Sequence, residues 1–204
     1  MGFLKCGLAT IALLLAACTA PQPERFSASA PKATESVGIA FRSVEVLDVS
    51  LPTYAAAEEI TTQGAGGRLT ADTEAFWADS PERSISLALT RNLVELTGAR
   101  VASEPWPFET PPEARLDIRF ESLVAQSNGQ FIASGQYFIG VIEDIDVADR
   151  EDGGEPVTRR NRENAGLFSL DVPFDPAGGP SAIAAARGQV VLQLATLIAR
   201  KGLR

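Results

Sequence analysis

Residues 115–141 (RLDIRFESLVAQSNGQFIASGQYFIGV) carry the most regular pattern in the chain. Leu116, Ile118 and Phe120 alternate with charged residues, which is the period-two pattern of a strand with one buried face. Ser127-Asn128-Gly129 is a turn signal between two strands. The returning strand has its inward set at Phe131, Ala133, Gly135, Tyr137, Ile139 and Val141. The stretch therefore predicts an antiparallel pair of strands with one face exposed to water.

Two segments have the spacing of amphipathic helices. The first is expected over Ser80–Thr97, because Asp79 or Ser80 can cap its start and Gly98 ends it. Its apolar stripe consists of Ile85, Ala88, Leu89, Leu93 and Leu96. The second is expected over Pro180–Lys201, with Ile183, Val190, Val191, Leu194 and Ile198 toward the core. Such stripes normally form a core, so both helices are expected to pack against the sheet.

Shorter strands complete the predicted domain. Val37–Val46 is expected to be a strand with a bulge near Ser43, which Leu51-Pro52-Thr53-Tyr54 ends. Glu59–Gln63 and Arg68–Thr70 are expected to form a hairpin around the glycine-rich run 64–67, which lacks the following Lys-Ser/Thr pair of a phosphate-binding loop. Two more strands are expected at Arg100–Ser103 and Ala165–Phe174. The fold class is therefore α/β (α+β), a single compact domain over residues 37–204 with a mixed, largely antiparallel sheet and two main helices.

The N-terminus has the features of a bacterial lipoprotein signal. Lys5 precedes an apolar run, and Leu15-Ala16-Ala17-Cys18 places a cysteine where the small-residue cleavage pattern would end. The run is too short to span a bilayer, which needs about 20 apolar residues. Residues 1–17 are therefore predicted to be a signal peptide, and Cys18 to be acylated. Several acyl chains on one residue make a stable membrane anchor.

Residues 19–36 (TAPQPERFSASAPKATES) have the composition of a linker. Residues 18–36 are accordingly predicted to be the acylated cysteine and a flexible tether, and the folded part is expected to begin at Val37. Phe26 is the one large apolar residue in the tether, and it is expected to dock onto the domain.

Composition excludes several function classes. The formal charge is −8, and loss of Lys5 with the signal makes it −8 − 1 = −9, which argues against nucleic acid as a partner and against electrostatic binding to anionic lipid. The chain has no histidine, and Cys18 would be the sole cysteine left after cleavage, so His-dependent nucleophile systems and the usual zinc sites are excluded. The acidic run Glu143–Glu155 fails the calcium-loop register at Ala148. We therefore expect no enzyme activity, no cofactor and no metal.

Two aromatic pairs have open roles. Phe76 and Trp77, just ahead of the first helix, are expected to seal the core, although they could instead contact a partner. Trp106 and Phe108 lie in the proline-rich stretch 104–112. That loop could present side chains to a partner or fold back as a lid on the sheet edge, and the sequence does not choose between these roles.

The order of elements resembles a known family. The features that carry the resemblance are Cys18 in the signal, Pro52 and Tyr54 ahead of Ile60, Trp77-Ala78 before the first helix, and the strand containing Gly135-Gln136-Tyr137. Together they resemble the PqiC/YmbA family of ABC-type transport auxiliary lipoproteins over nearly the whole mature chain.

The resemblance implies a protein anchored by acylated Cys18 to the periplasmic face of the outer membrane, a location that Thr19, in place of an aspartate, also favours. It further implies an inner-membrane-anchored MCE-domain partner, inter-membrane phospholipid transport, and rings formed by copies of the chain. Pro52, Tyr54 and Trp106 are the predicted partner-binding residues. A periplasmic lipid-binding carrier and an envelope-assembly interaction lipoprotein remain alternatives. A Ser-Lys hydrolase is disfavoured because the mature chain contains only Lys32 and Lys201.

Overall fold

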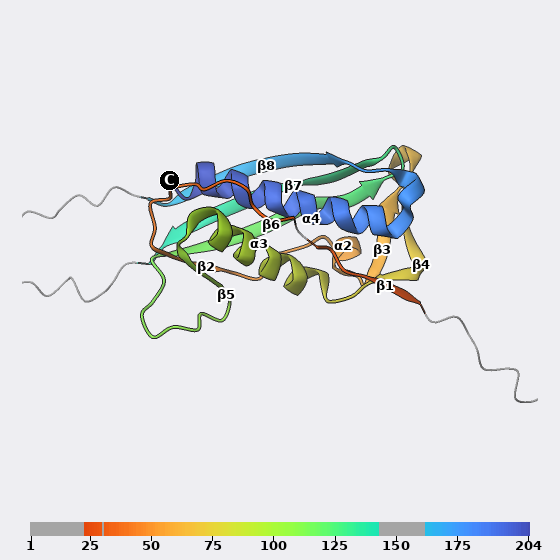
Figure 1. Ribbon diagram of the computed structural model, residues 1–204. Coiled ribbons are helices and arrows are strands. Elements are labelled where there is room, and N and C mark those ends of the chain that lie inside the picture. Colours follow the sequence, from red (N-terminus) through yellow and green to blue (C-terminus); the bar gives the residue numbers. More distant parts are fainter. Residues whose placement is uncertain (1–22, 30, 143–161) are drawn as a thin grey trace, which may run out of the picture.

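The computed structural model describes residues 23–29, 31–142 and 162–204 (Figure 1). Its strands are β1 (Glu24–Phe26), β2 (Ser43–Val46), β3 (Glu59–Gln63), β4 (Leu69–Trp77), β5 (Arg100–Ser103), β6 (Ala114–Gln126), β7 (Gln130–Val141) and β8 (Asn164–Pro173). Its helices are α2 (Thr53–Ala56), α3 (Pro81–Thr97) and α4 (Gly179–Leu197), with short turns at Ala65–Gly67, Pro176–Gly178 and Ile198–Gly202. Cys18 and the acidic run Glu143–Glu155 lie outside the described residues.

These strands form one mixed eight-stranded sheet. The long strand β6 pairs antiparallel with β7, and β7 pairs antiparallel with β8. On its other edge β6 pairs in parallel with β2 near its start and with β3 near its end. The hairpin β3–β4 carries β1 in parallel on its outer edge, and β2 carries β5 in parallel. The antiparallel ladders are the longest, which confirms the predicted fold class.

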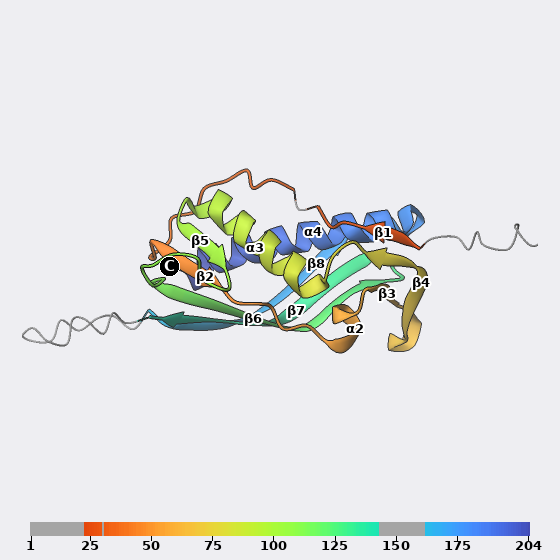
Figure 2. The same cartoon turned by 90° about the horizontal axis from the view of Figure 1, so that it is seen from below.

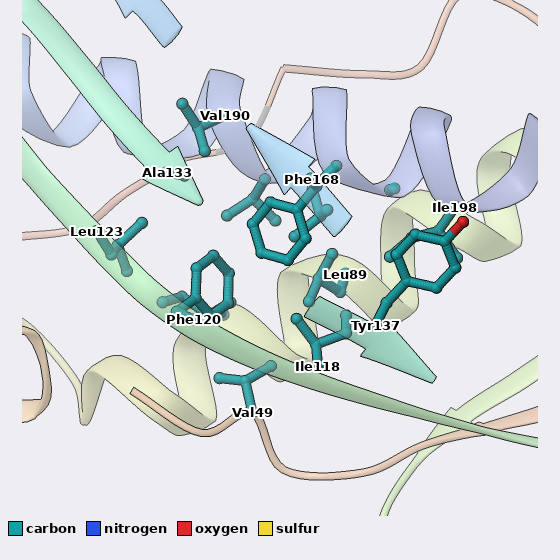
Figure 3. Close-up of a cluster of buried hydrophobic side chains, with 14 of the residues drawn as sticks. Val49, Leu89, Ile118, Phe120, Leu123, Ala133, Tyr137, Phe168, Val190 and Ile198 are labelled. Atoms are coloured by element: carbon teal, nitrogen blue, oxygen red, sulfur yellow. The ribbon is translucent and has the colours of Figure 1, made fainter. Parts of the chain in front are cut away.

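The helices α3 and α4 cover one face of the curled sheet (Figures 1 and 2). Their apolar stripes are buried between them and the strands, where the rings of Phe120 and Phe168 meet edge to face with their centroids 5.3 Å apart (Figure 3). The segment Pro176–Gly202 is long and apolar enough to cross a membrane, but 61% of its apolar window is buried inside the fold. Its burial against the sheet identifies it as a core helix of the domain. Gly98 ends α3 in the left-handed conformation, as predicted.

The β6–β7 hairpin confirms the strongest sequence pattern. Five of the six predicted inward positions of β7 are buried, and Val141 at the end of the strand is partly exposed. On the opposite face Arg119 stacks over Phe138, with 5.0 Å from guanidinium carbon to ring centroid, and the Gln136 side chain donates to Glu121 Oε1 at 2.9 Å. This face of the sheet is therefore the polar one.

The structure differs from three local predictions. Within the predicted strand Val37–Val46, only the last four residues form a strand, β2. The earlier residues bond to distant parts of the chain instead: the backbone N–H of Val37 donates to the Leu96 carbonyl oxygen at the end of α3, and that of Ala40 donates to the Leu203 carbonyl oxygen near the C-terminus. Residues 53–56 form the short helix α2, an element that the sequence pattern does not predict. The strand β4 continues to Trp77, which is buried in the core as expected.

The predicted tether is also folded over much of its length. Residues 24–26 form β1 on the edge of β4, so the fold begins well before Val37. Phe26 packs against the core, as expected. Further along, the backbone N–H of Ala33 donates to Glu95 at 3.3 Å, and Glu35 forms an ion pair with Arg200. The chain thus crosses the helical layer before it enters β2.

Gly135 in β7 leaves no room for a side chain. A Cβ at this position would lie 2.1 Å from the Arg119 carbonyl oxygen and 2.9 Å from Phe120 Cα. We expect Gly135→Ala to lower the free energy of unfolding by about 3 kcal/mol or more, measured by urea denaturation, because backbone atoms must move. Gly140→Ala in the same strand is the control, since nothing lies within 4 Å of its Cβ position. Equal stability of the two variants would contradict this explanation.

Candidate functional site

The predicted site residues occupy opposite ends of the fold. The helix α2, which carries Tyr54, lies toward the β3–β4 end, whereas the loop after β5, which carries Trp106, lies near the C-terminus (Figures 1 and 2). The structure therefore does not bring them together. Among the described residues, no group of three or more His, Cys, Asp or Glu side chains could hold a metal ion.

Pro52 and Tyr54 build a junction on β6. Pro52 precedes α2, and its carbonyl oxygen accepts hydrogen bonds from the backbone N–H groups of Ala55 and Ala56 at 2.8 and 3.0 Å. The Tyr54 hydroxyl accepts from the backbone N–H of Leu123 at 3.2 Å. Leu123 lies in the part of β6 between its pairing with β2 and its pairing with β3. Tyr54 therefore supplies a hydrogen bond that no neighbouring strand provides there.

A small cavity of about 20 Å³ lies beside Tyr54 and Trp77 and is lined in part by Arg187. The Arg187 guanidinium stacks 3.7 Å from the centroid of the Trp77 ring, and its Nη2 donates to Ser84 Oγ at 2.8 Å. Its Nε has no hydrogen-bond partner among the described residues. The cavity has room for about one water molecule, which is enough to hydrate that Nε but not to hold an organic ligand.

Burial lowers the pKa of Arg187 to about 10, so the side chain still carries its charge at neutral pH. A buried charge is costly unless it is paired. No carboxylate in the described part of the chain pairs with Arg187, and the Trp77 ring supplies a cation–π contact instead. The sequence analysis missed this residue. Its signal was a single arginine within the otherwise apolar stripe of α4, at a position where helical spacing predicts burial.

The Trp106 loop is fixed to the sheet. The backbone N–H of Trp106 donates to Glu45 Oε1 at 3.1 Å, and its indole N–H donates to the Thr110 carbonyl oxygen at 2.7 Å. Glu45 is buried, and its other carboxylate oxygen accepts from Arg115 Nε at 2.6 Å. Phe108 packs edge to face on Trp106, with ring centroids 5.0 Å apart, and is 45% exposed. The loop therefore folds back on the sheet edge and at the same time presents an aromatic side chain to solvent.

An open cleft of about 600 Å³ lies between this loop and the first residues of β2 and β5. Glu113 lines it and accepts hydrogen bonds from Arg42, at 2.8 Å from the backbone N–H and 2.7 Å from Nε. Burial acts to raise the pKa of Glu113, but the two hydrogen bonds and the positive charges of Arg42 and Arg162 together lower that pKa below 4.5. The Arg42–Glu113 ion pair thus forms part of the cleft wall, which suits contact with a polar group of a ligand or partner and not with an acyl chain.

The Tyr54 hydroxyl should matter to stability. We expect Tyr54→Phe to lower the free energy of unfolding by about 1–3 kcal/mol, because the Leu123 N–H loses its acceptor. Tyr137→Phe is a matched control, since the Tyr137 hydroxyl makes no hydrogen bond within the described residues although its ring is buried. Urea denaturation of both variants measures the effect, and an equal loss from both would show that the hydrogen bond to Leu123 contributes nothing.

The Glu113–Arg42 pair should give a pH dependence of known sign. A carboxyl group whose pKa is lower in the folded state stabilises the protein above its unfolded pKa, near 4.5, and loses this contribution as the pH falls through its folded pKa. We therefore expect Glu113→Gln to be less stable than the wild type near neutral pH, with the difference shrinking below pH 4.5. Glu109→Gln, an exposed neighbour without a hydrogen bond to the described residues, should show no such difference. A Glu113→Gln difference that does not change with pH would contradict the assignment.

Comparison with known proteins places the chain in a family. Among curated proteins none matches it. A crystal structure of an uncharacterized protein has the same fold, with a TM-score of 0.63 and 17% identity, over 86% of this chain and 96% of that one. A DUF330 protein from Xanthomonas campestris has a TM-score of 0.56 and 16% identity, over 89% of this chain and 93% of that one. Identities this low show the fold alone.

The sequence profile of one family spans almost all of the described fold. It begins within β1 and ends in the turn that follows α4, so that it includes the β6–β7 hairpin and both main helices. This extent agrees with the fold shared with the two crystal structures. Because the profile of the ABC-type transport auxiliary lipoprotein component matches residues 25–199, the chain belongs to that family.

Proposed function

We propose that the protein is a lipoprotein anchored through acylated Cys18 to the periplasmic face of the outer membrane, where it docks an inner-membrane-anchored MCE-domain protein in a phospholipid transport system. The observation that carries this proposal is the family match over residues 25–199, whose description already names a lipoprotein and an ABC-type transporter. The signal-like segment ending at Cys18 lies directly ahead of the matched region. Residues 1–17 would be removed, and the acylated chain would begin at Cys18.

The packing of the domain supports a role in docking a protein partner over a role in carrying lipid. The centre of the domain is filled by side chains such as Phe120 and Phe168 (Figure 3), and the cavity beside Arg187 measures only about 20 Å³. Sites for molecules of drug size usually have about 300–1,000 Å³ of mostly apolar space. The larger cleft beside Glu113 is open and lined by charged groups. A lipid-binding carrier therefore has less support than a docking module.

The Trp106 loop supports a docking role for the end that carries it. Its hydrogen bonds to Glu45 and Thr110 hold the loop in place, so little conformational entropy is lost when a partner binds. Phe108 is exposed, and the Arg100 guanidinium lies 5.2 Å from the centroid of its ring. Aromatic and arginine side chains are the ones that most often dominate binding energy. Pro52 and Tyr54 remain predicted contacts, although the Tyr54 hydroxyl is already used within the fold.

The anchor and the partner can be tested in one preparation. The tagged full-length protein, extracted from envelope membranes in mild detergent, should carry a fatty-acid label and should recover an MCE-domain protein, identified by mass spectrometry. Cys18→Ala should lose the label, because it removes the acylation site. An unlabelled wild type would overturn the anchor, and a labelled wild type without an MCE-domain protein would overturn the partner. Co-purified phospholipid at one molecule per chain would favour the carrier instead.

The docking end has its own matched pair of variants. Phe108→Ala should reduce recovery of the partner by about tenfold or more, the loss typical of an aromatic hot spot. Leu167→Ala on β8 should not, although Leu167 is 78% exposed, because it lies on a different surface. Copies of the chain are also expected to form a ring, and native mass spectrometry of the acylated protein would measure their number. Equal recovery with both alanine variants would remove the loop from the interface.

A further inference from the structure

The N-terminal segment is attached to the edge of the sheet only a few residues after Cys18. The backbone of β1 pairs with β4 from Glu24 opposite Ala75 to Phe26 opposite Trp77, and the N–H of Ala78 donates to the Phe26 carbonyl oxygen at 2.9 Å. Arg25 Nη1 donates to the Trp77 carbonyl oxygen at 3.0 Å and forms an ion pair with Glu58 at 3.2 Å. Phe26 is partly buried against the core. The chain is therefore tied to the fold at residue 24 and not at Val37.

This attachment shortens the reach of the anchor. From Cys18 to Glu24 is 24 − 18 = 6 residue steps, which span at most about 20 Å when fully extended. The domain is longer than that, because α4 alone has 19 residues and is about 28 Å long, with loops beyond both of its ends. The anchor therefore reaches lipid from one end of the domain only.

The direction of β1 identifies that end. Because β1 runs parallel to the last residues of β4, the chain arrives from the side on which β4 begins. β4 itself begins at Leu69 and has an irregularity before Phe76, where its register with β3 shifts. Leu69 follows the turn Ala65–Gly67 that joins β3 to β4. In both views this hairpin and β1 lie at the end opposite to β5 and the C-terminus (Figures 1 and 2).

We infer that the domain stands on the bilayer with its β3–β4 hairpin at the lipid headgroups, and that the end carrying Trp106 and Phe108 points away from the membrane, where a protein partner can reach it. This inference rests on the proposed acylation of Cys18. It divides the surface into a lipid-facing end and a partner-facing end. The predicted contacts at Pro52 and Tyr54 then lie nearer the lipid-facing end than Trp106 does.

The chemistry of the hairpin turn fits a headgroup surface. Its residues are exposed, and Gly66 and Gly67 allow the tight turn with φ of 72° and 80°. Arg68 offers a charge-assisted hydrogen bond to lipid phosphate, and Leu69, which is 41% exposed, offers an apolar contact at the interface. One cation cannot hold a mature chain of charge −8 − 1 = −9 on anionic lipid, so the acyl chains provide the binding and the hairpin only orients the domain.

The orientation can be tested by fluorescence quenching on the acylated full-length protein. The chain has two cysteines, of which Cys6 leaves with the signal and Cys18 is modified, so one introduced cysteine can be labelled selectively. Arg68→Cys marks the hairpin and Glu109→Cys marks the opposite end, and both positions are exposed. The proteins are reconstituted into vesicles of phosphatidylethanolamine and phosphatidylglycerol that carry a headgroup-level quencher. The mass of each purified chain reports its acylation separately.

The fluorescence of the label at position 68 should be strongly quenched, and that of the label at position 109 should not be quenched. A 20-residue Gly-Ser insertion between Pro23 and Glu24 should abolish the difference, because such a linker adds about 25 Å of flexible reach. Acylated, vesicle-bound protein with equal quenching at both positions, or with stronger quenching at 109, would overturn the orientation while leaving the anchor intact. An unacylated wild type would overturn both the anchor and the orientation that depends on it.

Discussion

The long strand β6 is the constraint on which the rest of the structure depends. One edge is fully paired with β7, but its other edge is longer than any single strand beside it. That edge is divided among β2 at its start, the bridge from Ser50 to Arg119, the Tyr54 hydroxyl at Leu123, and β3 at its end. Buried backbone groups need partners, so the segment between β2 and β3 must follow β6 closely.

This division separates the molecule into two ends. Since β2 pairs with the start of β6, it brings β5 and the Trp106 loop to one end, where Glu45 links the loop to Arg115. Since β3 pairs with the far end of β6, the β3–β4 hairpin and β1 lie at the other. The two ends of this small domain can therefore make separate contacts on opposite sides.

Local patterns were enough to predict the parts of the fold that local interactions determine. The period-two alternation of β6 and β7 and the capped apolar stripe of α3 place those elements nearly to the residue. The pairing of β1 could not be predicted, because three residues carry no period and their partner lies about fifty residues later in the chain. The role of Tyr54 could not be predicted either. Its hydroxyl accepts a hydrogen bond at a place where neither β2 nor β3 pairs with β6, and that unpaired stretch follows only from the sheet topology.

Trp77 connects the N-terminal attachment to the centre of the domain. Its carbonyl oxygen accepts from Arg25, its backbone lies opposite Phe26, and its ring lies under the buried Arg187 of α4. The parallel pairing of β1 covers only three residues, so the contacts of Arg25 and Phe26 add to its attachment. Because Trp77 is itself buried at 6% exposure, it connects β1 to the core and to α4. The desolvation cost of Arg187 is then part of a junction that fixes the N-terminal segment to the helical layer.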